Sequence, residues 1–162
     1  MKLHDWQETQ KQQKGRLQGG KSMGYEYYEK DGKTIKRELF NEEAEKEAKK
    51  WAARRYKGKP ELSNTQVRKF YNEIKAIERY IEMREPNTFV EKLPEIKMIK
   101  AKAAYAYGRK LQKKGGSITK EFKEFLDTNI DSIKTQRDFQ IFCKLFEAVL
   151  GFFEFYSFSQ NN

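Results

Sequence analysis

The chain of 162 residues lacks the features that would indicate several common classes of protein. It has one cysteine, Cys143, and one histidine, His4, which excludes an intramolecular disulfide framework and the Cys/His clusters that hold structural zinc. No run approaches the roughly 18 consecutive apolar residues that a membrane-spanning helix needs, and residues 1–13 are polar where a signal peptide would be apolar. These absences predict a cytoplasmic protein that uses no membrane, no metal and no other cofactor.

Positive charge and aromatic side chains are what the chain has in excess. There are 34 Lys and Arg against 24 Asp and Glu, giving a formal net charge of +10, which favours anionic partners such as nucleic acid or an acidic membrane face. Aromatic residues make up 14% of the chain, more than a disordered basic tail would contain. At this length we expect one folded domain.

The polar and apolar patterns divide the chain into three parts. Residues 1–39 are rich in Gln, Lys and Gly and predict an N-terminal arm, with a short hairpin at 25–37 around Asp31-Gly32. An isolated hairpin is only marginally stable in water, so this one would need a surface to pack against. Residues 40–158 predict a helical domain, and residues 159–162 a short tail.

Apolar residues at helical spacing predict an all-α fold, a compact bundle of about five helices. In the second helix, Ser63 with Gln66 forms a capping box and Pro86 stops the helix. Thr135 with Asp138 gives a similar start to the fifth helix. The third is expected to begin near Thr88, or with Pro94 in its first turn. The fifth is apolar on most of its circumference and should be the buried centre. The predicted ranges are 41–57, 63–85, 88–114 or 94–114, 118–133, and 135 to about 156.

No catalytic residue or metal ligand is predicted. Residues Gly15–Ser22 match the Walker A pattern, but the polar residues before them do not form the buried strand that a working phosphate loop follows. Asp127 and Asp131 are four residues apart and could share a metal, yet two such acids on a surface helix are usually only solvated. Cys143 lies in the most apolar helix and reads as a small core residue.

Two rows of cations are the strongest functional indication from the residues themselves. Between residues 97 and 114 there are seven Lys and Arg and no acidic residue, so this helix has no partners of its own for these charges. Lys102, Arg109 and Lys113 fall on one arc beside Tyr105, which suits a nucleic acid backbone with an occasional stacked base. The second helix aligns three further cations, Arg68, Lys75 and Arg79. The alternative is that these are ordinary solvated faces.

Three blocks of sequence resemble a known family. They are Leu62–Tyr71 (Leu-Ser-Asn-Thr-Gln-Val-Arg-Lys-Phe-Tyr), Ile99–Arg109 (Ile-Lys-Ala-Lys-Ala-Ala-Tyr-Ala-Tyr-Gly-Arg) and Phe142–Phe153. In this order, on a basic helical chain, they resemble the small helical subunit of type III-A CRISPR-Cas effector complexes, the Csm family. The likeness covers about residues 40–155.

The resemblance implies a non-catalytic subunit that acts in antiviral defence. Several copies would stack into an inner filament beside the other subunits of the complex and hold guide RNA and target RNA by their backbones. The matched blocks then imply RNA contacts at Arg68, Lys100, Lys102 and Arg109, although Lys100 lies near the apolar arc and could simply reach past the core to water.

Two other hypotheses stay open. The chain could be a scaffold whose cationic row docks an acidic protein partner. In that case the late aromatics would form an oligomer interface, although a buried central helix accounts for most of them; they are Phe152, Phe153, Phe155, Tyr156 and Phe158. The enzyme alternative is a small nuclease that uses Asp127 and Asp131.

Overall fold

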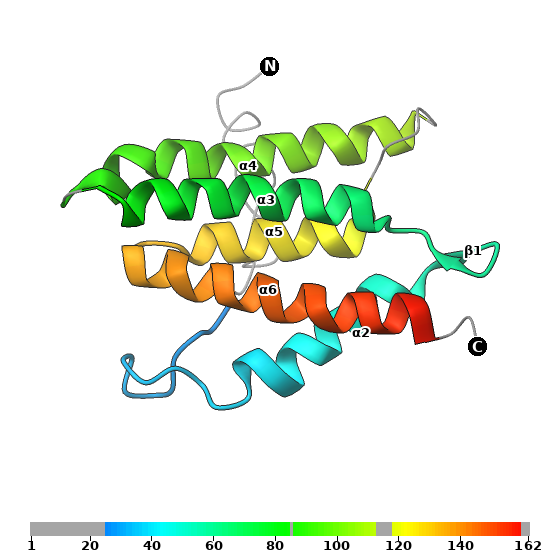
Figure 1. Ribbon diagram of the computed structural model, residues 1–162, viewed down its shortest axis with the longest axis horizontal. Coiled ribbons are helices and arrows are strands. Elements are labelled where there is room, and N and C mark those ends of the chain that lie inside the picture. Colours follow the sequence, from blue (N-terminus) through cyan, green and yellow to red (C-terminus); the bar gives the residue numbers. More distant parts are fainter. Residues whose placement is uncertain (1–24, 85, 113–117, 160–162) are drawn as a thin grey trace, which may run out of the picture.

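The computed structural model describes residues 25–84, 86–112 and 118–159, and confirms the all-α fold. Several predictions lie outside these residues: the Walker-like segment Gly15–Ser22, most of the arm, Lys113, and residues 160–162 of the tail. A short π-helical turn, η1, leads into α2, and four longer helices follow (Figure 1). The bounds are η1 Leu39–Glu43, α2 Ala44–Ala53, α3 Asn64–Glu82, α4 Thr88–Leu111, α5 Lys120–Ser132 and α6 Gln136–Ser159.

Helix α6 is the centre of the core, as its nearly all-round apolar sequence predicts. In Figure 1, α3 and α4 lie on one side of it and α2 on the other, with α5 behind. The indole of Trp51 on α2 packs edge-on against four phenylalanine rings of α5 and α6 at centroid distances of 4.9–5.9 Å; they are Phe122, Phe125, Phe146 and Phe153. This aromatic cluster joins α2, α5 and α6.

Both capping signals that the sequence predicts are present. The Ser63 hydroxyl oxygen accepts a hydrogen bond from the backbone N–H of Gln66 at 3.2 Å, which satisfies one free N–H at the start of α3. At the start of α6 the arrangement is reciprocal. The Asp138 N–H donates to the Thr135 hydroxyl oxygen at 3.1 Å, and the Asp138 carboxylate accepts from the Thr135 N–H at 3.0 Å.

The predicted end of the first helix is wrong. Helix α2 ends at Ala53, and the chain then forms a two-stranded antiparallel hairpin, β1 (Arg55–Tyr56) and β2 (Lys59–Pro60). Lys57 and Gly58 have φ values of 51° and 77°, the left-handed conformations that a two-residue hairpin turn needs. The hairpin contains Tyr56, which lies within the expected helix 41–57, and leaves it 68% exposed.

The third helix begins at Thr88, so Pro94 lies inside α4 and not in its first turn. Proline has no N–H to donate to the carbonyl of Val90. Pro94 and Val90 are both exposed, Val90 by 65%, so this face of the helix is open to water. The missing hydrogen bond is therefore tolerated here.

The segment 25–37 packs against the helical domain. Tyr28 and Ile35 form an antiparallel bridge across the turn, where Gly32 has a φ of 67°. The Tyr27 hydroxyl donates to the buried amide oxygen of Asn129 on α5 at 2.8 Å, and the Tyr28 hydroxyl donates to Asp138 on α6 at 2.6 Å. Helices α5 and α6 therefore supply the surface that such a hairpin needs.

Candidate nucleic-acid interface

A groove between α3 and α4 holds the densest group of candidate functional side chains. Its main hollow has a volume of about 500 Å³, and an adjoining hollow of about 390 Å³ continues toward the turn between the two helices. The two hollows share Glu73, Met98 and Lys102. We call the two hollows together the α3–α4 groove.

The sequence explains why a groove forms here. Small side chains, Ala76 on α3 and Ala101 and Ala106 on α4, line it and leave room between the helices. Phe70 on α3 is almost completely buried and closes its floor. The groove is therefore an apolar trough with polar and charged side chains along its rim.

The rim of the main hollow is positively charged. Lys69 of α3 and Lys102 and Arg109 of α4 line it, against one acidic side chain, Glu73. Lys102 forms an ion pair with Glu73 across the groove, whereas Lys69 and Arg109 have no ion pair with any residue that the structure describes. Two of the three cations are therefore available to an anionic ligand.

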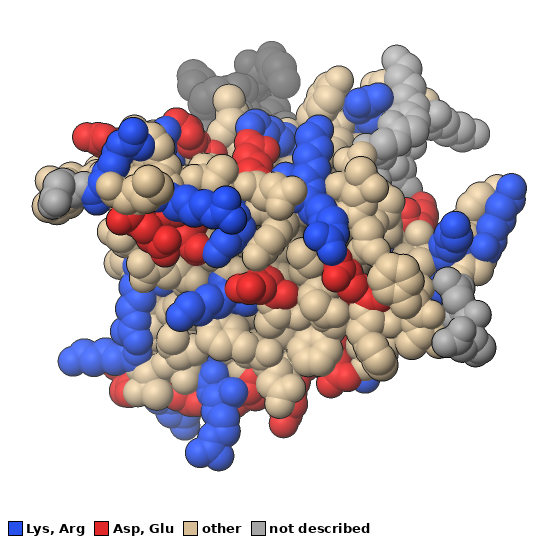
Figure 2. All heavy atoms as spheres, in the orientation of Figure 1, with Lys and Arg blue, Asp and Glu red and all other residues tan. Residues whose placement is uncertain are grey.

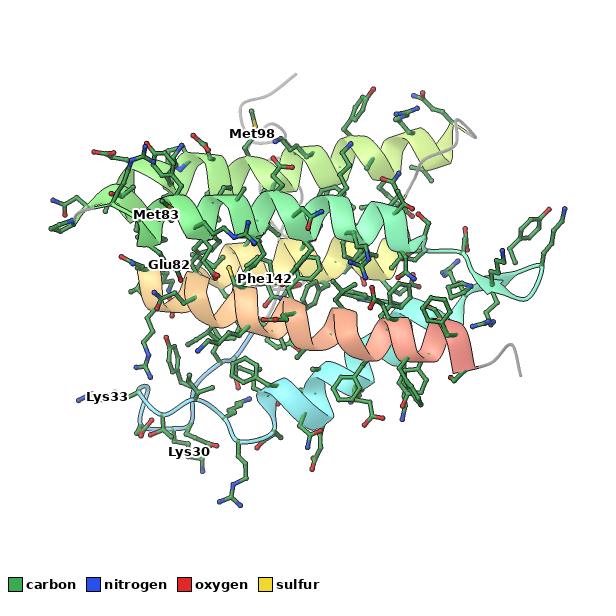
Figure 3. All side chains as sticks on the ribbon, viewed as in Figure 1. Lys30, Lys33, Glu82, Met83, Met98 and Phe142 are labelled. Carbon is green, nitrogen blue, oxygen red and sulfur yellow. The ribbon has the colours of Figure 1, made fainter. Side chains whose placement is uncertain are left out.

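An exposed aromatic ring stands beside these cations. Tyr105 is 70% exposed, and the Arg109 guanidinium lies 6.0 Å from the centre of its ring. Met98, on the same side of α4, is 57% exposed, and Figure 3 shows it on the outer side of that helix. An exposed ring with cations around it is the arrangement that contacts the bases and phosphates of a single nucleic acid strand.

The structure brings only some of the predicted contact residues into this groove. Lys102, Tyr105 and Arg109 line it, as their common arc predicts. Arg68 lies on another face of α3 and pairs with Glu154 of α6. Lys75 is half-buried and pairs with Glu78. Arg79 follows the same row, about 60° around α3 from the groove-lining Ala76, and is exposed without lining either hollow.

The remaining predicted contact that the structure describes faces α5. The Lys100 ammonium lies 2.6 Å from the carboxylate of Asp131. Its neighbour Lys97 donates to the backbone carbonyls of Ile130 and Ile133 at 2.5 and 3.1 Å, at the end of α5. Burial lowers the pKa of Lys97. Both lysines therefore serve the packing of α4 on α5.

Neighbouring helices thus supply the acidic partners that the basic helix itself lacks. Glu73 of α3 forms an ion pair with Lys102, and Asp131 of α5 forms one with Lys100. Figure 2 accordingly shows blue and red side chains next to one another over α3 and α4, with a mostly tan area over the C-terminal half of α6. Of Lys100, Lys102 and Arg109 on α4, Arg109 is the one without an ion pair to any residue that the structure describes, and it lines the groove.

The two carboxylates considered for catalysis form ion pairs with lysines. Asp127 pairs with Lys123 at 2.5 Å, and Asp131 pairs with Lys100. Within the described ranges, no group of three or more His, Cys, Asp or Glu could hold a metal ion. Burial raises the pKa of the Cys143 thiol. None of the helices in those ranges is long and apolar enough to cross a membrane.

Sequence reasoning missed the α3 side of the groove. Lys69, Glu73 and Tyr80 are spaced by four and seven residues, so they share a face at helical periodicity. This row was present in the sequence beside the row of Arg68, Lys75 and Arg79. Only the packing of α3 against α4 shows which row lines a groove.

These features define a class: a small, basic helical bundle with a cationic groove between two of its outer helices. A family model described as Csm2 Type III-A matches residues 38–159, from η1 to the end of α6. The chain therefore belongs to the Csm2 family, the small subunit of the type III-A CRISPR-Cas complex, and the resemblance seen in the three blocks is confirmed. No curated protein and no solved structure matches the chain.

Proposed function

We propose that this subunit is non-catalytic and binds the backbone of guide RNA and target RNA through the α3–α4 groove. The observation that carries the proposal is the convergence of Lys69, Lys102 and Arg109 on one groove beside the exposed ring of Tyr105. Cations at this position contact phosphate oxygens, which are the same in every RNA sequence. Binding is therefore independent of sequence and weakens steeply as salt rises.

Fluorescence anisotropy of an unstructured RNA of roughly 40 nucleotides tests the proposal, with unrelated sequences compared at several salt concentrations. Lys102→Glu with Arg109→Glu should weaken binding to every sequence and make the salt dependence shallower. Binding that is unchanged at matched salt would refute the proposed surface.

A matched control variant separates the effect of the groove from the effect of net charge. Lys30→Glu with Lys46→Glu changes the charge of the protein by the same amount, and both lysines are exposed. Figure 3 places Lys30 on the side of the molecule away from Met98. The control should bind RNA nearly as the unmodified protein does, and circular dichroism should give the same helicity for both variants.

The other predicted contacts form a second group in this proposal. Arg68, Lys75, Arg79 and Lys100 do not line the groove, and Arg68, Lys75 and Lys100 each form an ion pair with an acidic residue. Reversing the charge of Arg79 should therefore reduce RNA affinity less than reversing Arg109. Lys113 lies outside the described residues, and helical spacing in the sequence predicts it on the arc of Arg109; its reversal should resemble that of Arg109.

We also propose that copies of the subunit associate in a filament or dimer through the end of α6. Phe155 and Phe158 are 61% and 67% exposed, and the Phe155 ring lies 5.2 Å from that of the half-buried Tyr156. Neighbouring exposed rings of this kind mark interaction surfaces. Light scattering of Phe155→Ser with Phe158→Ser should show a lower mass than the unmodified protein at the same concentration, and an equal mass would refute this interface.

The scaffold hypothesis gives a different result in the same experiments. If the groove served an acidic protein instead of RNA, no RNA sequence would bind even at low salt. A nuclease would cleave RNA or DNA in magnesium or manganese and lose that activity in Asp131→Asn. Both carboxylates of that hypothesis have lysine partners, so we expect no cleavage.

A further inference from the structure

The adjoining hollow of the α3–α4 groove holds a second aromatic ring with cations around it. The Arg84 guanidinium lies 3.6 Å and the Lys92 ammonium 4.2 Å from the centre of the Tyr80 ring. Tyr80 and Lys92 line this hollow, and Arg84 is exposed at the end of α3. Sequence reasoning had assigned no role to these three residues.

Each end of the groove therefore has a tyrosine ring with two cations beside it. One has Tyr105 with Arg109 and Lys69, and the other has Tyr80 with Arg84 and Lys92. At the second end, Lys92 also forms an ion pair with Glu95 at 2.7 Å, so Arg84 is the cation there without an ion pair to a described residue. The ion pair of Lys102 with Glu73 lies between the two ends, because both of these residues line both hollows. The repetition of a ring and cations along one apolar trough is a pattern that suits a strand with alternating bases and phosphates.

The separation of the two positions sets the length of strand that would fill them. Lys69 and Tyr80 are eleven residues apart on α3, which is about 16 Å at 1.5 Å per residue. A stacked strand advances about 3.4 Å per nucleotide, so the groove spans about five nucleotides. This is within the range of roughly 4–16 nucleotides per binding site for proteins that hold single strands on aromatic rings.

We propose that the α3–α4 groove is a binding site for unpaired RNA, with one base against the ring of Tyr105 and another against the Arg84 guanidinium that covers the ring of Tyr80. The site rests on the proposed RNA-binding function and adds to it a choice of ligand. In a duplex the faces of the bases are covered by their neighbours, so they cannot stack on a protein ring. The groove therefore binds single-stranded RNA more tightly than duplex RNA of the same length.

The test compares one RNA sequence as a single strand and as a duplex, by anisotropy at matched salt. We expect Tyr105→Leu and Tyr80→Leu each to weaken single-strand binding on the order of tenfold, with duplex binding unchanged. Tyr105→Phe and Tyr80→Phe keep the ring and should bind as the unmodified protein does. The Phe variants separate loss of stacking from loss of fold.

Tyr56 provides a matched control for both leucine variants. It is 68% exposed and has the Lys57 ammonium 5.3 Å from its ring centre, but it lies in the β1–β2 hairpin. Tyr56→Leu should leave the binding of both RNAs unchanged. An equal loss in Tyr56→Leu would show that any exposed tyrosine has this effect, and would overturn the site.

The outcomes separate this site from the function on which it rests. If Lys102→Glu with Arg109→Glu weakens binding while the leucine variants bind normally, or if the duplex binds as tightly as the single strand, the stacking site is wrong and backbone binding stands. If that charge reversal has no effect on either RNA, the proposed function is wrong and the site fails with it.

Discussion

The ion pair between Glu73 and Lys102 makes a quantitative prediction about RNA affinity. Glu73 is the one acidic side chain among the described residues that line the main hollow, and its carboxylate contacts the Lys102 ammonium. An incoming phosphate must compete with Glu73 for this lysine. We therefore expect Glu73→Gln to bind RNA more tightly than the unmodified protein.

The size of the gain follows from the exposure of the pair. The side chains of Lys102 and Glu73 are 50% and 31% exposed, and exposed pairs of this kind contribute about 0.2–1 kcal/mol. Since 1.4 kcal/mol is a tenfold change, releasing Lys102 should raise affinity by about 1.4- to 5-fold. One further phosphate contact should also steepen the salt dependence, by about 0.7 in the slope of log affinity against log salt for a single strand.

Anisotropy titrations of four proteins check the reasoning: unmodified, Glu73→Gln, Lys102→Gln, and the double variant. The gain from Glu73→Gln should disappear in the Lys102→Gln background, because the glutamate acts through that lysine. Glu124→Gln is the control, since Glu124 has an exposed partner, Lys120, at 3.6 Å on α5, away from the groove. If RNA affinity rose by the same factor in the Lys102→Gln background, or in Glu124→Gln, the local effect would be refuted. The change in net charge would then explain the gain.

Two further predictions concern stability. Burial acts to raise the pKa of Asp138, but hydrogen bonds from Tyr28, Lys134 and Thr135 outweigh it and lower the pKa. The folded protein should therefore lose stability as pH falls below about 4. In urea unfolding curves measured at several pH values, Asp138→Asn should lessen this loss. Trp51→Leu leaves a void among four phenylalanine rings and should lower the free energy of unfolding by about 3 kcal/mol, whereas an unchanged urea midpoint would contradict the central place given to this ring.

The sequence determined the fold class and most helix boundaries because these depend on local features. Apolar spacing predicted five helices, and the capping residues Ser63 and Thr135 marked two starts that the structure reproduces. The predicted helix boundaries were wrong where another structural preference opposed the helical pattern. Lys57 and Gly58 take left-handed conformations and turn the end of the expected first helix into a hairpin, and Pro94 is tolerated inside α4 because its face is open to water.

Only the α4 side of the candidate site could be predicted from the sequence. Lys102, Tyr105 and Arg109 share one arc of one helix, so spacing alone grouped them, and the groove contains all three. Which row of α3 faces them depends on how two helices pack. Two rows were available, and the one containing Lys69, Glu73 and Tyr80 lines the groove while Arg68 turns toward α6.

The sequence by itself determined that the protein is a basic, all-helical member of its family, because composition, periodicity and motif order are properties of the chain. Only the tertiary structure decided which charges remain available to a ligand. Ion pairs join residues far apart in sequence, such as Lys102 with Glu73 and Lys100 with Asp131, and the distance between them is set by helix packing. Among the described residues, the positive charge of α4 is therefore reduced at Lys100 and Lys102, and Arg109 is left without an ion pair.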